Sequence, residues 1–565
     1  MRPAPTVFRV ALDTPLRRLF DYLPPAAPAH TAAPAPGMRV RVPFGRRRLI
    51  GVVMGEAAES ELPYERLKPI LEVLDPEPVL DGALLGLVSW AAEYYHHPVG
   101  EVVAAALPKA LRLGAPSVAL EERWVASAEG AAAQAAGEPK RAPKQRALLE
   151  FLLASRAAGE LDARLPGWRA TARALLARGL IVSSEVAAAS APSAAALRRA
   201  GPELNAEQAA ALSTVAAGLA HYGAFLLHGV TGSGKTEVYL RLIERVLAAG
   251  RRALVLVPEI GLTPQLLARF RERFETPLAV LHSALTDSER LAAWREAYSG
   301  RARIVLGTRS AVFAPVADLG LIVVDEEHDA SFKQHEGAPL YSARDLAVVR
   351  ARGADVPVVL GSATPSLETL HNVSSGRYQR LRLERRAAQA QPPVLKLIDL
   401  REAATRQGIA TPAVLAIERH LADDGQVLVF LNRRGYAPTL LCTACGWIAP
   451  CRECDARLTV HQGAGRLRCH HCGADAPLPA RCPQCGFAVK PVGQGTERIA
   501  ETLAALFPSV TVARLDRDVV RRRGDMEAVV ARIASGEARI LVGTQMVTKG
   551  HDFPNMTLVV VLNAD

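Results

Sequence analysis

A glycine-rich segment at residues 229–236 has the sequence Gly-Val-Thr-Gly-Ser-Gly-Lys-Thr and matches the phosphate-loop pattern G-x-x-x-x-G-K-[ST] in full. The apolar run Ala224–His228 before it predicts a buried strand, and Glu237–Ile243 after it predicts a helix. In that context the glycines let backbone N–H groups surround phosphate oxygens at a helix N-terminus, which a chance glycine turn would not do. We expect this segment to bind ATP through Gly229, Val230, Thr231, Gly232, Ser233, Gly234, Lys235 and Thr236.

The acidic segment Leu321–His328 completes the expected catalytic set. Its four apolar residues predict a buried parallel strand, and open α/β sheets bind ligands at the carboxyl ends of such strands. We expect Lys235 to reach the β- and γ-phosphates and Thr236 to hold Mg²⁺. Asp325 can complete the Mg²⁺ shell, and Glu326 can orient or deprotonate the attacking water. An isolated acidic strand end is usually only solvated, but beside a phosphate loop it predicts a nucleoside-triphosphate hydrolase.

The overall composition favours a globular protein with a polyanionic partner. Of the 565 residues, 49% are hydrophobic and 22% are charged, and the formal net charge is +11. This charge favours nucleic acid above a membrane surface. No apolar run is long enough to cross a bilayer, and Met1–Pro5 lacks a signal-peptide core. We therefore expect a cytoplasmic protein with no membrane partner.

The hydrophobic pattern predicts an α/β fold with two parallel-sheet lobes, the second incomplete, and such lobes are similar to RecA-like lobes. Strands alternate with helical stretches in the first lobe, at 224–228, 253–257, 278–281, 304–307, 321–325 and 356–361. The second lobe has strands at 426–430 and 540–543, with a cysteine-rich module inserted between them. The expected domains are a β-rich N-terminal domain (1–107), a winged-helix-like domain (108–186), a linker (187–200), the first lobe (201–388), the second lobe in two parts (389–440 and 491–565) and the cysteine module (441–490).

The N-terminal region offers weaker signals. Met38–Gly45 and Leu49–Met54 predict a hairpin around the basic tip Arg46–Arg48, which is either a solvated turn or a contact to the DNA backbone. A helix is predicted over 84–95, and the following His96 and His97 favour packing or exposure over a metal site. Helices at 143–152 and 168–180, with a strand after them, fit a winged helix or a plain helical spacer.

All eight cysteines fall between Cys442 and Cys485 as four C-x-x-C pairs, which favours metal over disulfides. Cys454 and Cys469 are separated by 14 residues, near the spacing of a zinc ribbon, and a hairpin through Arg457–Arg468 would join their pairs. We therefore expect two nested Zn²⁺ sites, an inner set of Cys451, Cys454, Cys469 and Cys472 and an outer set of Cys442, Cys445, Cys482 and Cys485. Sequential pairing of neighbouring pairs is the main alternative, and iron–sulfur ligation is another. His470 and His471 are expected to be bystanders.

Short motifs at strand ends, Val257–Gln265, Gly307–Ser310 and Gly361–Pro365, follow the order and spacing of superfamily 2 helicase motifs. Together with further segments, they make the whole chain resemble the PriA family of replication-restart helicases. The further segments are Leu19–Pro24, Val42–Gly45, Tyr94–Pro98, Asn432–Tyr436, Gly495–Arg498, Gly543–Gly550 and the eight cysteines.

This resemblance implies 3′→5′ unwinding of forked DNA and loading of primosome proteins, with single-stranded-DNA-binding protein as a further partner. It implies that Gln208 bonds the adenine base. It also implies that the loop Ser331–His335 couples DNA contact to ATP hydrolysis through Phe332 and Lys333, although Phe332 could equally pack in the core. In the N-terminal domain, the residues implied to grip a DNA 3′ end are Phe20, Asp21, Tyr22, Gly45 and Lys68.

The family pattern continues beyond Val561–Asp565 with an arginine-bearing motif and a C-terminal DNA-binding domain, so we expect a C-terminally truncated chain. An arginine finger contributes about 10³–10⁵ in turnover. A chain without it would bind ATP and DNA yet hydrolyse or unwind poorly. A fork-binding scaffold without unwinding activity is therefore the alternative function, and an RNA helicase is a weaker one.

Overall fold

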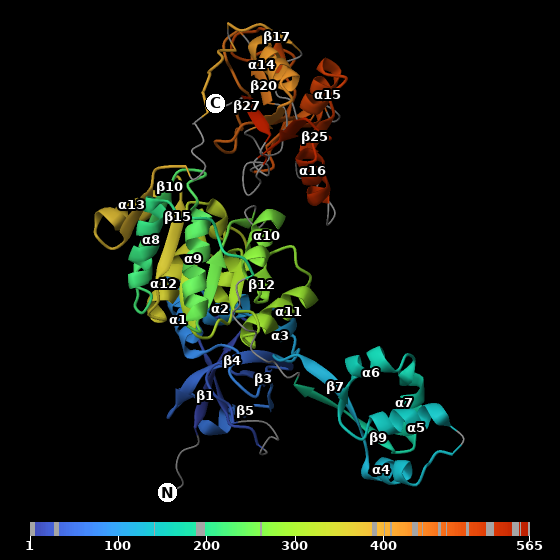
Figure 1. Ribbon diagram of the computed structural model, residues 1–565. Helices are drawn as coiled ribbons and strands as arrows, with labels where there is room; N and C mark the ends of the chain where they lie inside the picture. The colour runs from blue at the N-terminus through green and yellow to red at the C-terminus, as the bar shows by residue number, and fades with distance from the viewer. Residues whose placement is uncertain are drawn as a thin grey trace. The chain divides into compact units, whose positions relative to one another are not determined.

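The computed structural model describes residues 6–26, 33–140, 142–187, 198–259, 263–386, 393–400, 402–406, 409–431, 439–442, 444–461, 465–469, 472–492, 496–515, 525–544, 553 and 555–562. Contacts divide the chain into two compact units, residues 1–259 with 269–390, and residues 260–268 with 391–565. Figure 1 shows the elements of both units. Among the helices of the described residues, none is long and apolar enough to cross a membrane.

The N-terminal domain is built on a six-stranded sheet in the order β5-β2-β1-β4-β3-β6. Its elements are β1 (Val7–Leu12), β2 (Phe20–Leu23), β3 (Arg39–Phe44), β4 (Arg47–Ala57), the 3₁₀ turn η1 (Tyr64–Arg66), β5 (Lys68–Pro69) and β6 (Glu72–Val73). Alternate residues of each strand, such as Val10, Val40 and Val53, form its buried core. The predicted hairpin is present, with Phe44 opposite Arg47 across a two-residue turn.

Three helices follow this sheet, α1 (Gly82–Tyr94), α2 (Val99–Ala106) and α3 (Lys109–Arg112). Asp81 caps α1 by accepting the Leu84 N–H at 2.8 Å. Leu87 of α1 and Val103 of α2 belong to the same buried cluster as Phe313 of the first α/β lobe. Figure 1 shows α1 and α2 against that lobe, so the N-terminal domain is joined to it through shared core.

A buried ion pair fastens the sheet to the end of α3. Arg39 and Asp75 have fully buried side chains, and Arg39 Nη2 lies 2.7 Å from Asp75 Oδ1. Arg39 Nη1 also donates to the carbonyl oxygens of Leu111 at 2.6 Å and Ala115 at 2.9 Å. Both charges are therefore paired and hydrogen-bonded, as buried charges must be.

Residues 120–187 form a small core of their own. Their elements are β7 (Leu120–Ala126), α4 (Ala128–Ala135), α5 (Pro143–Phe151), β8 (Arg156–Ala157), α6 (Ala158–Arg164), α7 (Trp168–Ala177) and β9 (Ile181–Ala187). The antiparallel strands lie in the order β8-β7-β9, and the Trp124 ring meets the Trp168 ring edge-on at 5.3 Å. The helices and strands that a winged helix needs are present, although the assignment itself stays a prediction.

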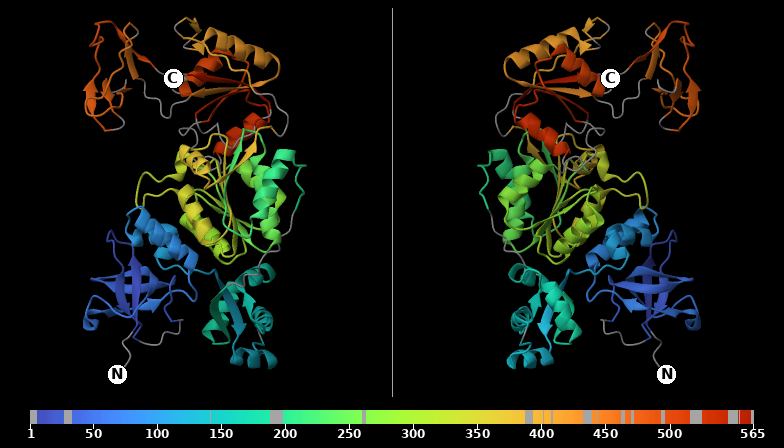
Figure 2. Two further views of the ribbon diagram at one scale, coloured as in Figure 1. Left: turned by 90° about the vertical axis from the view of Figure 1, so that its left-hand side faces the viewer. Right: turned by 90° about the vertical axis from the view of Figure 1, so that its right-hand side faces the viewer.

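The first α/β lobe is a seven-stranded parallel sheet in the order β12-β13-β11-β14-β15-β10-β16, with helices on both faces (Figure 2). Its strands are β10 (Ala224–Gly229), β11 (Arg252–Leu256), β12 (Leu278–Leu281), β13 (Ile304–Gly307), β14 (Leu319–Asp325), β15 (Val358–Ser362) and β16 (Gln379–Leu383). Its helices are α8 (Ala206–Ala217), α9 (Lys235–Ala248), α10 (Pro264–Arg273), α11 (Asp287–Tyr298), α12 (Ala343–Gly353) and α13 (Leu367–Ser374), with the 3₁₀ turns η3 (Arg309–Phe313) and η4 (Ala330–Phe332). The predicted α/β class is confirmed.

The second lobe contains a parallel sheet in the order β25-β26-β19-β27. Its elements are β17 (Thr405–Arg406), β18 (Ile409–Ala410), α14 (Thr411–Ala422), β19 (Gln426–Leu431), α15 (Thr496–Leu506), β25 (Val512–Leu515), α16 (Asp525–Ala534), β26 (Ile540–Gly543) and β27 (Met556–Leu562). The inserted cysteine module has an antiparallel sheet of β20 (Thr439–Cys442), β21 (Thr459–His461), β22 (Arg466–Arg468), β23 (Asp475–Pro477) and β24 (Val489–Val492). Its first and last strands, β20 and β24, pair with each other, so the module begins and ends side by side.

Candidate functional site

The phosphate loop lies between the end of β10 and the start of α9. Gly232 and Gly234 have positive φ angles of 79° and 81°, a conformation that glycine adopts without steric cost. Lys235 opens α9 and is only 9% exposed, and its Nζ donates to the Gly229 carbonyl at 2.9 Å. The lysine side chain therefore folds back along the loop instead of extending into solvent.

The loop has the shape and the donors that a triphosphate needs. Ser233 Oγ is buried, and among the residues that the structure describes it has no hydrogen-bond partner. A side chain at Gly229 would overlap that oxygen, so the absence of a Cβ keeps this part of the loop open. Backbone N–H groups in such a concave loop, with Lys235, suit phosphate oxygens. The residues present therefore fit the phosphate groups of ATP.

Gln208 has other partners than the predicted adenine base. It is 4% exposed, its Oε1 accepts the Asn205 N–H at 2.9 Å, and its Nε2 donates to the Ser233 carbonyl at 2.9 Å. Both polar atoms of the amide are engaged within the protein and hold the phosphate loop, and the expected contact of Gln208 with the adenine base stays a prediction. The spacing Asn205-x-x-Gln208, a helix capping box, is the sequence signal for this arrangement.

Two acids at the end of β14 face different surroundings. The Tyr239 hydroxyl donates to Asp325 Oδ1 at 3.1 Å. Burial and then the charge of Glu326 raise the pKa of Asp325 to about 6, against the opposing effect of Lys235. Glu326 has a left-handed backbone with φ of 48°, and its Oε2 lies 3.6 Å from His328 Nδ1. An acid whose pKa is raised in this way is stabilised as the anion by a divalent cation.

A third acid, Glu327, was not singled out from the sequence. It is 1% exposed and accepts hydrogen bonds from the Ser366 N–H at 2.7 Å and the Thr369 hydroxyl at 2.8 Å. The neighbouring His328 Nδ1 lies 2.8 Å from Ser362 Oγ. These bonds hold the acidic segment to the segment that follows β15. The spacing Ser366-x-x-Thr369 is typical of a helix N-terminus, where Ser366 caps α13 by accepting the Thr369 N–H. This spacing is the feature of the sequence that could have indicated these bonds.

The residues predicted to hold a DNA 3′ end lie on β2, on β5 and in the β3–β4 turn. The Phe20 ring meets the Phe44 ring edge-on at 5.2 Å, beside Gly45, whose φ is 59°. Tyr22 is 4% exposed, and its hydroxyl donates to the Pro43 carbonyl at 3.0 Å. The structure therefore brings Phe20, Tyr22 and Gly45 together. The Tyr22 ring is part of the core, which leaves Phe20 as the half-buried aromatic suited to stacking.

Asp21 points away from these aromatic rings, because successive residues of β2 face opposite sides of the sheet. The Ser60 hydroxyl donates to Asp21 Oδ2 at 2.6 Å, and Arg9 Nε lies 4.0 Å from Asp21 Oδ1. Lys68 is exposed and lies opposite Tyr22 in the parallel β2–β5 pair. The acid and the aromatic of the proposed 3′-end site thus lie on different faces of β2, and Ser60 is a neighbour that the sequence did not indicate.

The two residues predicted to couple DNA contact to ATP hydrolysis, Phe332 and Lys333, differ in exposure. Phe332 is 2% exposed within the core of the first lobe, which favours the core-packing alternative, and its contact with DNA stays a prediction. Lys333 is exposed and available to a phosphate. Arg309 Nη1 donates to the carbonyl oxygens of Ser331 at 3.2 Å and Lys333 at 3.4 Å. The Gly307–Ser310 segment therefore holds the backbone on which Lys333 stands.

The structure groups the cysteines in the nested arrangement. Cys442, Cys445, Cys482 and Cys485 form one cluster and Cys451, Cys454, Cys469 and Cys472 the other, with the sulfur atoms of each within 4.8 Å of one another. Sγ–Sγ distances of 3.4 to 3.6 Å exclude disulfides. About 2.3 Å Zn–S bonds place tetrahedral thiolates roughly 3.8 Å apart, so both clusters fit Zn²⁺. Sequential pairing does not agree with this grouping.

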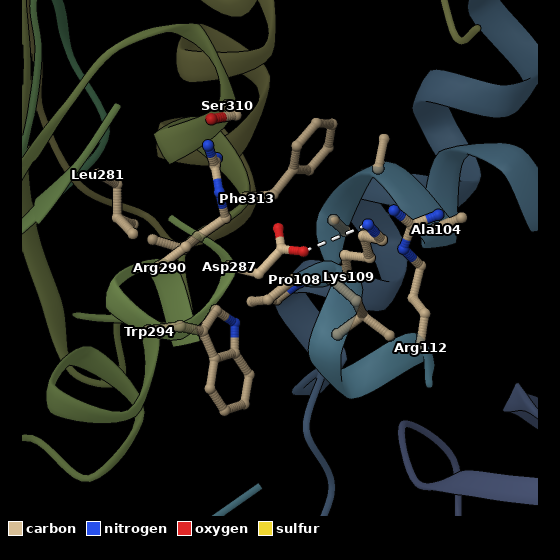
Figure 3. Close-up of a pocket in the computed structure, with 14 residues that line it drawn as sticks. Ala104, Pro108, Lys109, Arg112, Leu281, Asp287, Arg290, Trp294, Ser310 and Phe313 are labelled. Atoms are coloured by element: carbon tan, nitrogen blue, oxygen red, sulfur yellow. Dashed lines mark ion pairs between the residues drawn. The ribbon is translucent and has the colours of Figure 1, made fainter. Parts of the chain in front are cut away.

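A cavity of about 330 Å³ lies between α2–α3 and the first lobe, in the shared interface of the two domains. Figure 3 shows Lys109, Arg112 and Arg290 around it, with Lys109 paired to Asp287 at 3.3 Å. Its excess of positive charge favours an anionic occupant such as a phosphate group.

Some residues of the predicted motifs lie outside the part of the chain that the structure describes. They are residues 260–262, 432–436, 470–471, 495 and 545–550.

Three family models match the chain. The 3′DNA-binding domain (3′BD) model matches residues 9–108, the DEAD/DEAH box helicase model matches 205–373, and the PriA DNA helicase Cys-rich region (CRR) model matches 451–477. The solved structure of RecG bound to a three-way DNA junction is 18% identical over 64% of this chain and 38% of that chain, with a TM-score of 0.36, which is too low to bear on function. A parallel sheet with this phosphate loop, within a DEAD/DEAH match and beside a DNA-binding domain, defines an ATP-hydrolysing DNA helicase.

Relatives with curated names identify the family, within this class of helicases, to which the chain belongs. The replication restart protein PriA of Haemophilus influenzae is 44% identical and covers 99% of this chain and 77% of that protein. The PriA proteins of Bacillus subtilis and Treponema pallidum are 36% and 34% identical, covering 94% and 98% of this chain and 75% and 74% of those proteins. The chain belongs to the family of the replication restart protein PriA, and the resemblance seen in the sequence is confirmed.

Proposed function

We propose that this chain unwinds forked DNA with 3′→5′ polarity, and that it uses ATP and Mg²⁺ bound at the phosphate loop. The observation that carries the proposal is the phosphate loop, with Lys235 folded along it and Asp325 and Glu326 at the end of β14, in one chain with a match to a 3′ DNA-binding domain. Lys235 neutralises phosphate charge, Thr236 and Asp325 hold the metal, and Glu326 orients the attacking water.

The N-terminal sheet supplies the DNA 3′-end contact in this proposal. The half-buried Phe20 ring stacks on a base and the exposed Lys68 meets a phosphate, while Asp21, on the other face of β2, accepts the 3′-hydroxyl in place of Ser60. Lys333 adds a phosphate contact from the first lobe. The proposal also includes single-stranded-DNA-binding protein and primosome proteins as partners and a cytoplasmic location, as the resemblance to the PriA family implies. Two Zn²⁺ shape the cysteine module and take no part in catalysis, because four cysteines complete each shell.

The test of this function separates ATP turnover from DNA binding. Lys235→Ala should abolish ATP hydrolysis and strand displacement on a forked duplex, while fork affinity stays largely unchanged. Arg245→Ala, which removes an exposed positive charge from the same helix, is the matched control and should leave both activities intact. An unchanged ATPase rate in Lys235→Ala would show that the loop has been misassigned.

Polarity and the scaffold alternative are tested on the unmodified chain. Duplexes with a single-stranded 3′ or 5′ tail are compared with and without ATP, and the proposal expects displacement from the 3′-tailed duplex only. Fork binding without ATP-dependent displacement on any duplex would replace the helicase with the binding scaffold. Equal stimulation of the ATPase by RNA and DNA forks would favour the RNA helicase.

A further inference from the structure

The Tyr94–Pro98 segment, to which the proposed function gives no role, connects the N-terminal domain to the first lobe by two hydrogen bonds. Tyr95 Oη accepts the backbone N–H of Ser342 at 3.3 Å, and His97 Nε2 accepts the backbone N–H of Leu340 at 2.9 Å. Both acceptor residues come shortly after the end of α1 in the chain, whereas both donor residues lie between η4 and the start of α12. This short loop therefore adds to the contacts that the shared core and the Lys109–Asp287 ion pair make between the two domains.

The surroundings of both side chains agree with these bonds. His97 Nδ1 lies 3.8 Å from Glu101 Oε2, so this ring nitrogen is directed toward the carboxylate and Nε2 toward the Leu340 N–H. Burial raises the pKa of Tyr95 to about 12, so its hydroxyl remains neutral and accepts through a lone pair.

The loop that they hold, residues 333–342, is a hairpin with two differently anchored arms. Lys333 and Ser342 form an antiparallel bridge, and the Gln334 N–H donates to the Tyr341 carbonyl at 2.9 Å. Arg309 holds the first arm through the carbonyl oxygen of Lys333. The two acceptors from the N-terminal domain hold the second arm, so the position of Lys333 depends on both domains.

The first arm leads directly to the proposed catalytic acid. The Asp329 N–H donates to the Glu326 carbonyl at 2.9 Å, and the Ser331 N–H donates to Asp329 Oδ1 at 2.8 Å. These two bonds link the backbone of Glu326 to the residues just before the base of the hairpin, which begins at Lys333.

A second connection leads from His97 to the proposed 3′-end site. The Arg17 guanidinium donates to the carbonyl oxygen of His96, the residue before His97. The next residue, Arg18, has its guanidinium over the Phe20 ring at 5.0 Å. The loop before β2 thus contacts both the aromatic proposed to stack on DNA and the backbone that carries His97.

We propose that Tyr95 and His97 are positioning residues that transmit occupancy of the N-terminal 3′-end site to the 333–342 hairpin, so that ATP turnover responds to the presence of a DNA 3′ end. This inference rests on the proposed function, which supplies both the 3′-end contact and the hydrolysis. Contiguous hydrogen bonds give the physical link, and an energetic coupling between the sites is the quantity to be measured.

The experiment uses the full chain and two forks that differ only in a 3′-hydroxyl or a 3′-phosphate at the branch. For each fork, affinity and steady-state ATP turnover are measured for wild type, His97→Ala, His97→Gln and Tyr95→Phe. Tyr94→Phe is the matched control, since Tyr94 is 61% exposed and only loses a hydroxyl beside the same segment. Turnover without DNA and the thermal midpoint are recorded for every variant.

Wild type should hydrolyse ATP faster on the hydroxyl fork than on the phosphate fork. In His97→Ala and Tyr95→Phe this turnover ratio should fall toward one, a loss of about fivefold or more where the coupling has the usual strength. Their affinity ratio for the two forks, turnover without DNA and thermal midpoint should stay at wild-type values. His97→Gln should recover part of the ratio, because its Oε1 can accept the Leu340 N–H.

The possible failures are distinguishable. Turnover ratios that stay at the wild-type value in both variants overturn the coupling and leave the proposed function standing. Affinity and turnover that fall together with the thermal midpoint also overturn it, since that pattern shows only a structural role. Wild type without DNA-stimulated turnover overturns the proposed function, and with it the coupling. Equal stimulation of wild type by both forks overturns the 3′-end role and the coupling alike. If His97→Ala does not fold, Tyr95→Phe, which loses one oxygen atom, decides the question.

Discussion

Gln208 and Glu327 place polar atoms in the interior, at 4% and 1% exposure, and use them to fix the backbone of loops that carry other functional groups. Gln208 binds the phosphate-loop carbonyl of Ser233, and Glu327 binds the N–H of Ser366. Buried and fully bonded polar groups rigidify their surroundings, because breaking one leaves a partner unsatisfied. The phosphate loop and the acidic segment are thus positioned by residues that need not touch the nucleotide.

Gly361 shows how little room remains behind the acidic segment. A Cβ there would overlap the Tyr239 hydroxyl and come within 2.7 Å of its Cζ, and Tyr239 is 2% exposed and cannot move away. We expect Gly361→Ala to lower the free energy of unfolding by about 1–3 kcal/mol. Calorimetry or denaturant unfolding measures this loss. Gly353→Ala, where the added Cβ meets no atom within 4 Å, is the control and should be neutral or slightly stabilising.

Asp21 is expected to determine which DNA end is preferred. Asp21→Ala removes the acceptor proposed for the 3′-hydroxyl, so preference for a 3′-hydroxyl over a 3′-phosphate should weaken while salt-dependent binding changes little. Competition binding with the two oligonucleotides measures the preference. Glu56→Ala, an exposed acid in the same sheet, should leave it intact. Equal discrimination by Asp21→Ala and wild type would place the end-binding site elsewhere.

Among the elements, β3 carries two ion pairs of different burial on nearby residues. Arg39 pairs with Asp75 where both side chains are fully buried, whereas Arg41 pairs with Glu72 at 2.8 Å where they are 33% and 53% exposed. Arg39 also bonds two carbonyls at the end of α3. The buried pair therefore sets how the sheet meets the helices that pack on the first lobe, and the exposed pair does not.

Asp75→Asn should lower the free energy of unfolding by about 3–5 kcal/mol, because it leaves the Arg39 guanidinium buried without a counter-charge. Glu72→Gln, on the neighbouring pair, should cost less than about 1 kcal/mol because that pair is exposed to solvent. Thermal or denaturant unfolding of the two variants measures the difference. Equal losses would mean that Arg39 is satisfied by its carbonyl partners alone.

The sequence predicted the elements whose signals are local. The phosphate loop indicated where β10 ends and α9 begins. Six strands of the first lobe were predicted within about two residues of their ends, because buried parallel strands are nearly continuous apolar runs. It missed β7, whose charged residues hide the alternation, and the short α3. The partners of Gln208, Asp21 and Phe332 could not be predicted, because they depend on tertiary packing between distant segments.

On the scale of the whole molecule, the chain divides into two compact units, and each holds one kind of site. Residues 1–259 with 269–390 contain the phosphate loop, the acidic segment and the proposed 3′-end residues. Residues 391–565 contain both cysteine clusters. Nucleotide chemistry and metal binding therefore belong to separate cores, and loss of one need not remove the other.

Metal analysis should find about two Zn²⁺ per chain and no iron. Changing Cys442 and Cys445 together to serine should leave about one Zn²⁺, with Cys482 and Cys485 open to alkylation. The four cysteines of the other cluster should stay protected by their metal. Peptide mapping of the alkylated protein identifies the exposed thiols. Exposure of Cys451 and Cys454 instead would establish sequential pairing.

The pairing of β20 with β24 also has a mechanical meaning. These two strands are antiparallel and adjacent. Tension between the flanking parts of the second lobe would therefore break their hydrogen bonds one after another, beginning at the Thr439–Val492 end. With Zn²⁺ bound to the outer cluster, we expect this opening to stop at Cys442, which lies at the end of β20 and whose cluster links the first cysteine pair of the module to the last. The outer cluster would then bear the load, and the inner cluster would be protected from it.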